Sequence, residues 1–328
     1  MTLVSRLKSS VAFTGPNLMG AVLGLGIAAV VAFQPAEALA RNAGIAPTPA
    51  PVAVASVPAA EAGPALWVIR DADSTIYLFG TIHVLRPQTI WRWAEVEAAF
   101  DNADQVWLEI SNPDDQAAIL PLVQQHGVAA DRPLNTLLSA SENTQLTEAA
   151  NAIGVPAAQM NIFRPWLAGL TLSVAPLVKA GYDPKSGVEL VLKARAEAAG
   201  KPVHGFETID EQVRILAGMP EAQQLAFLRG VLDGYDDATV ELDALVNDWS
   251  RGDVRAIERS AVTEMRRESP GIYRALLVDR NTNWAGQIQT LLDGSGAAFI
   301  AVGAAHLAGP DSVQAILARR GVRAERVH

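Results

Sequence analysis

The sequence predicts an α/β protein with a mixed central sheet formed from both ends of the chain and a large helical insertion in the middle. Strand-like runs lie near the start and at the end of the folded part, whereas residues from about 114 to 292 are mostly typical of helices. Half of the 328 residues are hydrophobic and 19% are charged, so the chain can bury a sizeable core. This composition excludes a chain that is disordered throughout.

Local patterns define the individual elements. Residues 65–70 and 75–81 are apolar, strand-like runs on either side of an Asp-Ala-Asp-Ser turn, which is typical of a hairpin. The uninterrupted apolar run at 297–302 is expected to be a strand covered on both faces. Further strands are expected at 105–110, 201–205 and 322–327, and helices outside the insertion at 91–102 and 311–319.

The N-terminal 40 residues have the layout of a secretory signal peptide. Arg6 and Lys8 provide a positive start, residues 19–33 are uninterruptedly apolar, and Ala38 and Ala40 suit a signal peptidase. Cleavage is expected after Ala40, which would place the protein in the periplasm or outside the cell. The alternative is an uncleaved membrane anchor, although a spanning helix needs about 20 apolar residues.

Residues 41–64 are rich in alanine and proline and are expected to form an extended linker. The folded domain is therefore expected to comprise residues 65–328.

The charge and the cysteine content exclude several classes of protein. Acidic residues outnumber basic residues by 35 to 26, so nucleic acid is not an expected partner. The chain has no cysteine, which excludes disulfides, thiolate metal ligands and a cysteine nucleophile. The sequence does not indicate an oligomeric state.

A short internal repeat is the most informative feature. Residues 76–83 and 299–306 are each an apolar run that leads into Gly-x-x-His, ending at His83 and His306. Because ligands bind beyond the carboxyl ends of strands in open α/β sheets, both imidazoles would face one pocket if the two strands were aligned neighbours.

Two carboxylates fit the same site. Glu109 ends a strand that otherwise looks buried, and Glu207 follows another short strand. A buried carboxylate is costly unless it is paired or bound to a cation. Two imidazoles with one or two carboxylates suit a divalent transition metal such as Mn, Co or Zn, with an open position for a water nucleophile. The alternative is a pair of hydrogen-bonded structural histidines, with Glu207 acting on a helix dipole.

Other hydrolase motifs are missing from the sequence. It contains no H-E-x-x-H helix, no G-x-S-x-G elbow and no P-loop. A metallohydrolase site would therefore have to be assembled from distant segments of the chain.

Over roughly residues 64–328 the sequence resembles the TraB/GumN (TraB/PrgY/GumN) family, which is related to the Tiki metalloproteases. The resemblance rests on a series of short motifs in the order of the family. These are Gly80-Thr81-Ile82-His83, Trp107-Leu108-Glu109, Arg164-Pro165-Trp166, Gly187-Val188-Glu189, Gly205-Phe206-Glu207-Thr208, Arg280-Asn281 with Trp284, and Gly303-Ala304-Ala305-His306.

The resemblance implies a metal centre at His83, Glu109 and His306, because the corresponding GxxH histidines and a glutamate are implicated in the Tiki activity. Arg280 is expected to hold a substrate carboxylate or an oxyanion, with Asn281 as a second donor. A buried salt bridge made by Arg280 is the alternative.

The sequence thus favours an exported, metal-dependent hydrolase that acts on peptides or on a small-molecule substrate. Glu207 would accept a proton or complete the metal shell. Two other functions fit the same residues: a non-catalytic binding or inhibitory protein that sequesters a peptide pheromone, a metal or haem, and an accessory protein of exopolysaccharide export.

Overall fold

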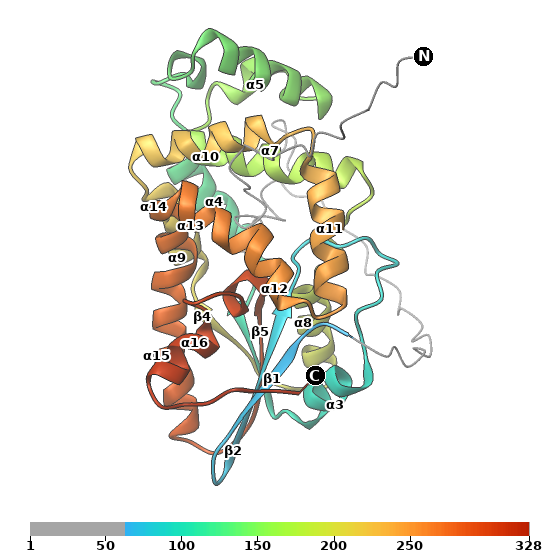
Figure 1. Ribbon diagram of the computed structural model, residues 1–328. Helices are drawn as coiled ribbons and strands as arrows, with labels where there is room; N and C mark the ends of the chain where they lie inside the picture. Colours follow the sequence, from blue (N-terminus) through green and yellow to red (C-terminus); the bar gives the residue numbers. More distant parts are fainter. Residues whose placement is uncertain (1–62, 328) are drawn as a thin grey trace, which may run out of the picture.

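The computed structural model describes residues 63–327, so the predicted signal peptide and residues 41–62 of the predicted linker lie outside the described residues. A six-stranded mixed sheet runs through the described part in the order β4-β3-β5-β2-β1-β6 (Figure 1). This confirms the predicted α/β class. The strands are β1 Leu66–Arg70, β2 Ser74–Thr81, β3 Gln105–Ile110, β4 Val203–Glu207, β5 Gly296–Gly303 and β6 Glu325–Arg326.

Helices cover both faces of the sheet, and in Figure 1 a further helical layer lies above it. The α-helices are α3 Ala94–Asn102, α4 Gln116–Gly127, α5 Ala140–Ala152, α6 Ala157–Met160, α7 Pro165–Lys179, α8 Val188–Ala198, α9 Ile209–Ala217, α10 Glu221–Asp233, α11 Ala238–Ser250, α12 Val254–Ile257, α13 Glu264–Glu268, α14 Pro270–Tyr273, α15 Asp279–Leu292 and α16 Val313–Arg319. Short 3₁₀ segments are η2 Leu134–Thr136, η3 Pro184–Ser186 and η6 Ala304–Leu307, and two π-helical segments are η4 Glu258–Thr263 and η5 Arg274–Val278. In the described part of the chain no helix is both long and apolar enough to cross a membrane.

The strand pairing joins the two ends of the folded domain in one sheet. β1 and β2 form the expected antiparallel hairpin, and β2 pairs in parallel with β5 from the other end of the domain. β5 pairs in parallel with β3, and β3 with β4. The edge strand β4 confirms the strand expected at 201–205, which lies within the range 114–292 of the expected helical insertion.

Side chains along the central strands alternate between two hydrophobic clusters. Phe299 and Ala301 of β5 belong to the larger cluster, which includes the helical layer, whereas Ile300 and Val302 belong to the smaller cluster with α15 and α16. This alternation follows from the two-residue period of a strand. It explains why the sequence of β5 is apolar without interruption.

Two boundaries differ from the sequence prediction. The helix expected from residue 91 begins only at Ala94, because Trp93 is buried in an extended conformation with φ −129° and ψ 163°. The strand expected over 322–327 is reduced to Glu325–Arg326, which pair with Val68 and Trp67.

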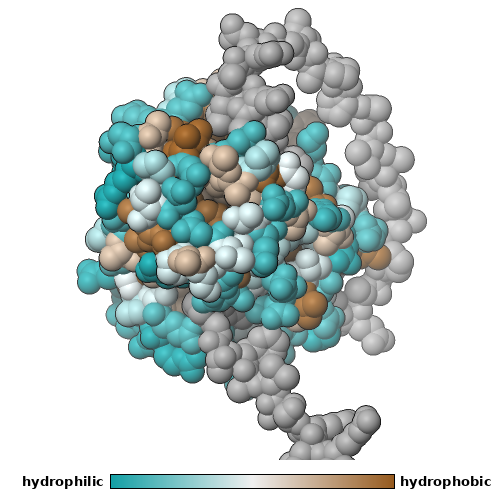
Figure 2. Space-filling model, turned by 90° about the horizontal axis from the view of Figure 1, so that it is seen from above, coloured by the Kyte–Doolittle hydropathy of each residue, from teal (hydrophilic) through white to brown (hydrophobic). Residues whose placement is uncertain are grey.

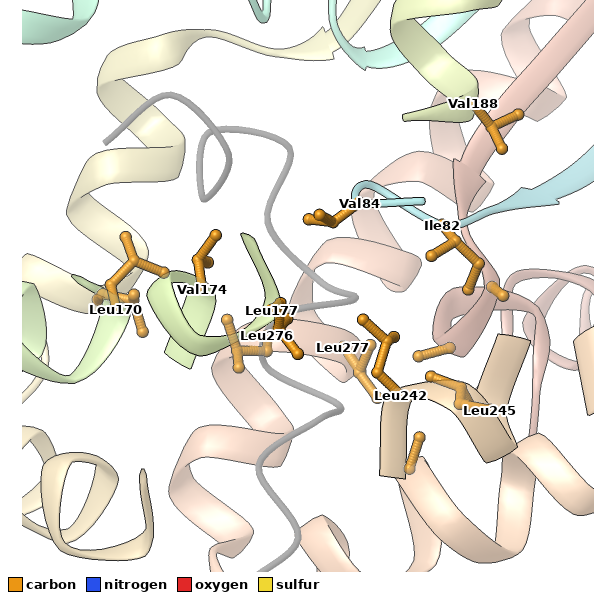
Figure 3. Packing of buried hydrophobic residues seen from close by; sticks show 14 of the residues in the cluster. Ile82, Val84, Leu170, Val174, Leu177, Val188, Leu242, Leu245, Leu276 and Leu277 are labelled. Carbon is orange, nitrogen blue, oxygen red and sulfur yellow. The ribbon is translucent and has the colours of Figure 1, made fainter. Parts of the chain in front are cut away.

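The helical layer packs directly on the segment that follows β2. Ile82 and Val84 belong to the same hydrophobic cluster as Leu242 and Leu245 of α11 and Leu277 of η5 (Figure 3). Because Ile82 and Val84 flank His83 in the sequence, this packing fixes the backbone on both sides of that histidine.

Hydrophobic side chains on the surface are few among the described residues. In the view of Figure 2 they occur in small groups separated by hydrophilic side chains. The large ones that are exposed are Ile90, Ile162, Val240 and Val327.

Lys201 joins α3 to the start of β4. Its ammonium group donates to the carbonyl oxygens of Phe100, Asp101 and Ala103, at 2.7, 2.8 and 2.7 Å. These carbonyls end α3, where a positive charge also interacts favourably with the helix dipole.

We therefore expect Lys201→Met to lower the free energy of unfolding by about 1–3 kcal/mol, because charge-assisted hydrogen bonds to a helix end are lost. Urea unfolding followed by circular dichroism measures this change. Lys185→Met is the matched control, since the Lys185 side chain is exposed. Equal stability of the two variants would contradict this role of Lys201.

Candidate active site

The two Gly-x-x-His segments leave neighbouring parallel strands at the same edge of the sheet. Thr81 of β2 is in register with Gly303 of β5, so the second motif is displaced by one residue relative to the first. His83 lies in the loop after β2, and His306 lies in η6. The condition for a shared pocket, that the two strands are aligned neighbours, is therefore met.

Glu109 of β3 brings the two histidines together. Its Oε1 lies 3.7 Å from Nε2 of His83 and 3.7 Å from Nε2 of His306. The same oxygen accepts a hydrogen bond of 2.9 Å from the backbone N–H of Gly303. All three side chains are buried, at 4% exposure or less.

Glu189 holds His83 from its other side. Nδ1 of His83 lies 2.5 Å from Oε1 of Glu189, in the first turn of α8. Because a carboxylate accepts, Nδ1 carries the hydrogen, and the remaining nitrogen Nε2 has no hydrogen-bond partner among the described residues. The start of α8 also contacts the backbone beside His83, since the N–H of Val188 donates to the carbonyl of Ile82.

Asn281 orients His306 in the same manner. Its Nδ2 donates to the carbonyl of Asp311 at 2.8 Å, so its Oδ1 accepts from Nδ1 of His306 at 2.6 Å. Nε2 of His306 then bears the lone pair and accepts from Nη1 of Arg280 at 3.1 Å. The ring of Trp284 packs against the imidazole, with 4.4 Å between the ring centroids.

Arg280 is the centre of the buried hydrogen-bond network. Its Nη2 donates to Glu109 at 2.7 Å and its Nε donates to Glu207 at 2.8 Å. Nη1 also donates at 3.2 Å to the carbonyl of Leu276, in the π-helical segment η5 one turn before Arg280. The guanidinium thus joins β3, β4, η5 and η6, and in this structure its polar atoms are directed at protein groups.

Glu207 contacts Arg280 but does not contact the histidines. Besides Arg280, its oxygens accept from Nε1 of Trp284 at 3.0 Å and from Nε2 of Gln212 at 3.3 Å. Gln212 also donates to Glu109 at 3.0 Å. Glu207 therefore positions Arg280 and takes no part in the direct contact between Glu109 and the histidines.

The network contains more negative than positive charge. Glu109, Glu189 and Glu207 are buried with a single guanidinium, so two negative charges are in excess while both histidines are neutral. Burial favours the neutral imidazole of His83, but Glu189 and Glu109 outweigh it and raise its pKa to about 9. Burial likewise opposes the charge of Glu109, but Arg280, the histidines and the Gly303 amide lower its pKa to about 2.

A small cavity adjoins His83. Its polar lining is Thr81, His83, Glu109 and Glu189, and the space open to the centre of a water molecule is about 10 Å³. That is room for about one water molecule or ion. Within residues 63–327 no group of three or more histidine, aspartate or glutamate side chains is arranged to hold a metal ion.

The structure brings together all six residues that the sequence singled out, namely His83, Glu109, Glu207, Arg280, Asn281 and His306. Sequence analysis did not assign Glu189 and Gln212 to the site. Glu189 belongs to the Gly187-Val188-Glu189 motif of the family resemblance, which was the signal that could have assigned it. Gln212 gave no signal beyond an amide in the first turn of the helix that follows β4.

The fold and the site together define a class: an α/β protein with a buried centre of histidine, carboxylate and arginine at the carboxyl ends of its parallel strands. A family model described as the TraB/PrgY/gumN family matches residues 65–326. The chain belongs to this family.

Relatives of the chain match most of its length at low identity. An uncharacterized protein of Treponema pallidum (strain Nichols) is 24% identical over 268 residues, which cover 77% of this chain and 80% of that protein. The uncharacterized protein YbaP of Escherichia coli (strain K12) is 22% identical over 256 residues, covering 77% of this chain and 92% of YbaP. No solved structure matches the chain.

Gly187 allows the close approach of α8 to His83. A β-carbon at this position would collide with the carbonyl oxygen of His83. We expect Gly187→Ala to destabilise the protein by about 1–3 kcal/mol, because this carbonyl belongs to the backbone and cannot move alone. Thermal unfolding measures the effect. Gly286→Ala in α15 is the control, because its nearest neighbour is 3.7 Å away, and a loss of stability as large as that of Gly187→Ala would contradict the steric explanation.

The pKa of His83 predicts a pH dependence of stability for the metal-free protein. Since this pKa rises from 6.5 to about 9 on folding, the stabilisation is fully present below about pH 6.5 and is lost as the pH approaches 9. We expect the stability difference between wild type and His83→Gln to fall by up to about 3 kcal/mol over this range. Urea unfolding with a chelator present, at several pH values, measures it. A difference that is independent of pH would contradict the shift.

Proposed function

We propose that the protein is an exported, metal-dependent hydrolase that acts on peptides. One observation carries the metal part: Glu109 Oε1 lies 3.7 Å from Nε2 of both His83 and His306, and side-chain oxygens hold the Nδ1 atoms of both rings. Such outer partners of ligating histidines are typical of metal sites. The export part rests on the signal-like pattern of residues 1–40.

The charge of the site supports a divalent cation. The buried carboxylates exceed the guanidinium by two negative charges, and a divalent ion would balance them without protonating His83. Unbalanced buried charge is strongly unfavourable. Imidazole nitrogen and carboxylate oxygen are ligands of Mn²⁺, Co²⁺ and Zn²⁺.

The residues present fit such an ion at His83 and Glu109. Nε2 of His83 has no hydrogen-bond partner among the described residues and is directed toward Oε1 of Glu109. His306 is the third ligand of the proposed set and supplies its second nitrogen, but its Nε2 accepts from Arg280 in this structure. Coordination by His306 therefore requires that contact to break.

The surrounding residues would keep the reacting groups in place. When bound, a divalent ion would activate water and polarise the scissile carbonyl. Arg280 and Gln212 hold Oε2 of Glu109, which keeps Oε1 toward the histidines. Glu207 holds Arg280, so its contribution to hydrolysis is the orientation of Glu109.

A peptide substrate requires the site to open, because the cavity is the size of one water molecule. Pro113, in the connection between β3 and α4, forms part of its wall. The same enclosure favours a second candidate function, a protein that binds a metal without turning over a substrate. The cavity in this conformation is far smaller than a haem.

The proposal predicts that the chelator-treated full chain takes up about one equivalent of Mn²⁺, Co²⁺ or Zn²⁺ and then cleaves members of a peptide library. We expect Glu109→Gln to weaken metal binding by more than about 10-fold and to abolish cleavage, because the central ligand loses its charge. Elemental analysis and mass spectrometry of the peptides measure these effects. Glu221→Gln, at an exposed ion pair with Arg132, is the matched control.

Two outcomes would contradict the proposal in different ways. Absence of metal from the wild-type protein after loading with all three ions would exclude the metal centre. Metal uptake without cleavage of any peptide would favour the binding protein.

A further inference from the structure

The outer edge of β4 carries backbone groups that no neighbouring strand covers. β4 is an edge strand and pairs on one side only, in parallel with β3. The N–H of Val106 in β3 donates to the carbonyl of Pro202, which therefore faces β3. Because successive residues of a strand alternate in direction, the N–H and C=O groups of Val203, Gly205 and Glu207 face away from β3.

These six backbone groups are open to solvent. None of them has a hydrogen-bond partner among residues 63–327. Gly205 is half-buried and has no side chain, so its exposed surface is main chain. Glu207 is half-buried as a residue although its side chain is only 6% exposed, so its exposed surface also belongs to the backbone. A sheet edge of this kind is a template for a further strand.

One face of this edge is aromatic. The rings of Trp107 in β3 and His204 in β4 stack with 4.9 Å between their centroids, and both residues are half-buried. A strand added to β4 would place one of its side chains directly beside His204, because opposite residues on one face of a sheet lie about 5 Å apart. An aromatic or aliphatic side chain at that position would extend the stacked row.

The size of the edge favours a peptide over a second copy of the chain. β4 has only five residues, whereas a stable dimer buries about 800 Å² on each partner. The large hydrophobic side chains exposed in the described part of the chain are Ile90, Ile162, Val240 and Val327, and none of them lies in β3 or β4. An extended peptide, in contrast, binds a sheet edge mainly through main-chain hydrogen bonds.

We propose that the outer edge of β4 binds the peptide substrate as an added strand, with an apolar or aromatic side chain beside His204. The proposal rests on the proposed function and names how its substrate is held. An added strand lies two strand spacings, or about 10 Å, from β3, which carries Glu109. An extended chain covers that distance in about three residues, so the scissile bond lies about three residues from the paired segment.

Fluorescence anisotropy of the chelator-treated full chain tests the main-chain pairing, because the chelator prevents metal-dependent cleavage. The probe is a fluorescein-labelled peptide of five phenylalanine-threonine repeats with a lysine at each end. Two further peptides carry N-methyl groups on every phenylalanine or on every threonine. Because only alternate N–H groups of an added strand face its neighbour, we expect one N-methylated peptide to bind at least about tenfold more weakly and the other to keep its Kd within about threefold.

Variants of β4 test the same pairing from the side of the protein. The N–H of Val203 faces outward, so its removal breaks no hydrogen bond to β3, and proline is tolerated at such edge positions. We expect Val203→Pro to raise the Kd of the unmethylated peptide about tenfold, whereas the matched control Val203→Thr keeps the N–H and binds as wild type. His204→Ala should raise the Kd about threefold. Circular dichroism verifies that each variant is folded.

Three outcomes would overturn the proposal, even if the metal-loaded chain cleaves peptides. These are equal Kd values for the two N-methylated peptides, which need no variant to fold, an unchanged Kd in Val203→Pro, and an unchanged Kd in His204→Ala. A wild-type chain that is dimeric in analytical ultracentrifugation and monomeric as Val203→Pro would show that a second copy occupies the edge, and would overturn it as well.

One outcome separates the edge from the proposed function. Peptide binding with the expected N-methyl pattern, but without cleavage after loading with Mn²⁺, Co²⁺ or Zn²⁺, would confirm β4 as the peptide site and contradict the hydrolase.

Discussion

The site depends on the burial of one guanidinium between two carboxylates. Arg280 donates to Glu109 of β3 and to Glu207 of β4, and it also contacts His306 and the carbonyl of Leu276. Removing one partner of such a buried network leaves an uncompensated charge, which costs about 3–5 kcal/mol. The helical segment 274–292 is thereby tied to the carboxyl ends of the parallel strands.

In this arrangement different residues contact the two carboxylate oxygens of Glu109. Gly303 and the histidines surround one carboxylate oxygen, and Arg280 and Gln212 hold the other. The negative charge of Glu189 remains on the far side of His83, where it raises the pKa of the imidazole. The resulting asymmetry, with Arg280 beside one histidine and a polar cavity beside the other, makes the two Gly-x-x-His motifs chemically unequal despite their similar sequences.

Much of the candidate site could be predicted from the sequence because its residues lie at strand ends. His83, Glu109 and His306 each follow a recognisable apolar run, and parallel neighbouring strands bring such ends to one edge. The roles of Glu207 and Arg280 could not be predicted in this way. Arg280 and its partner Glu207 are 73 residues apart in the sequence. Whether a buried arginine faces a substrate or such a distant carboxylate depends on side-chain directions that only the folded structure fixes.

The sequence alone determined the α/β class, the two covered faces of β5 and the candidate residues at the strand ends, because these depend on local periodicity. The strand order that brings these residues to one edge came from the tertiary structure. Only the tertiary structure decided that Glu189 and Gln212 join the site, and that His306 is held by Arg280 while Nε2 of His83 faces a cavity. The physical reason is that a hydrogen bond or a cavity requires atoms placed to within a few tenths of an ångström. That placement arises from the packing of α8, α9 and α15 against the sheet, which no local pattern encodes.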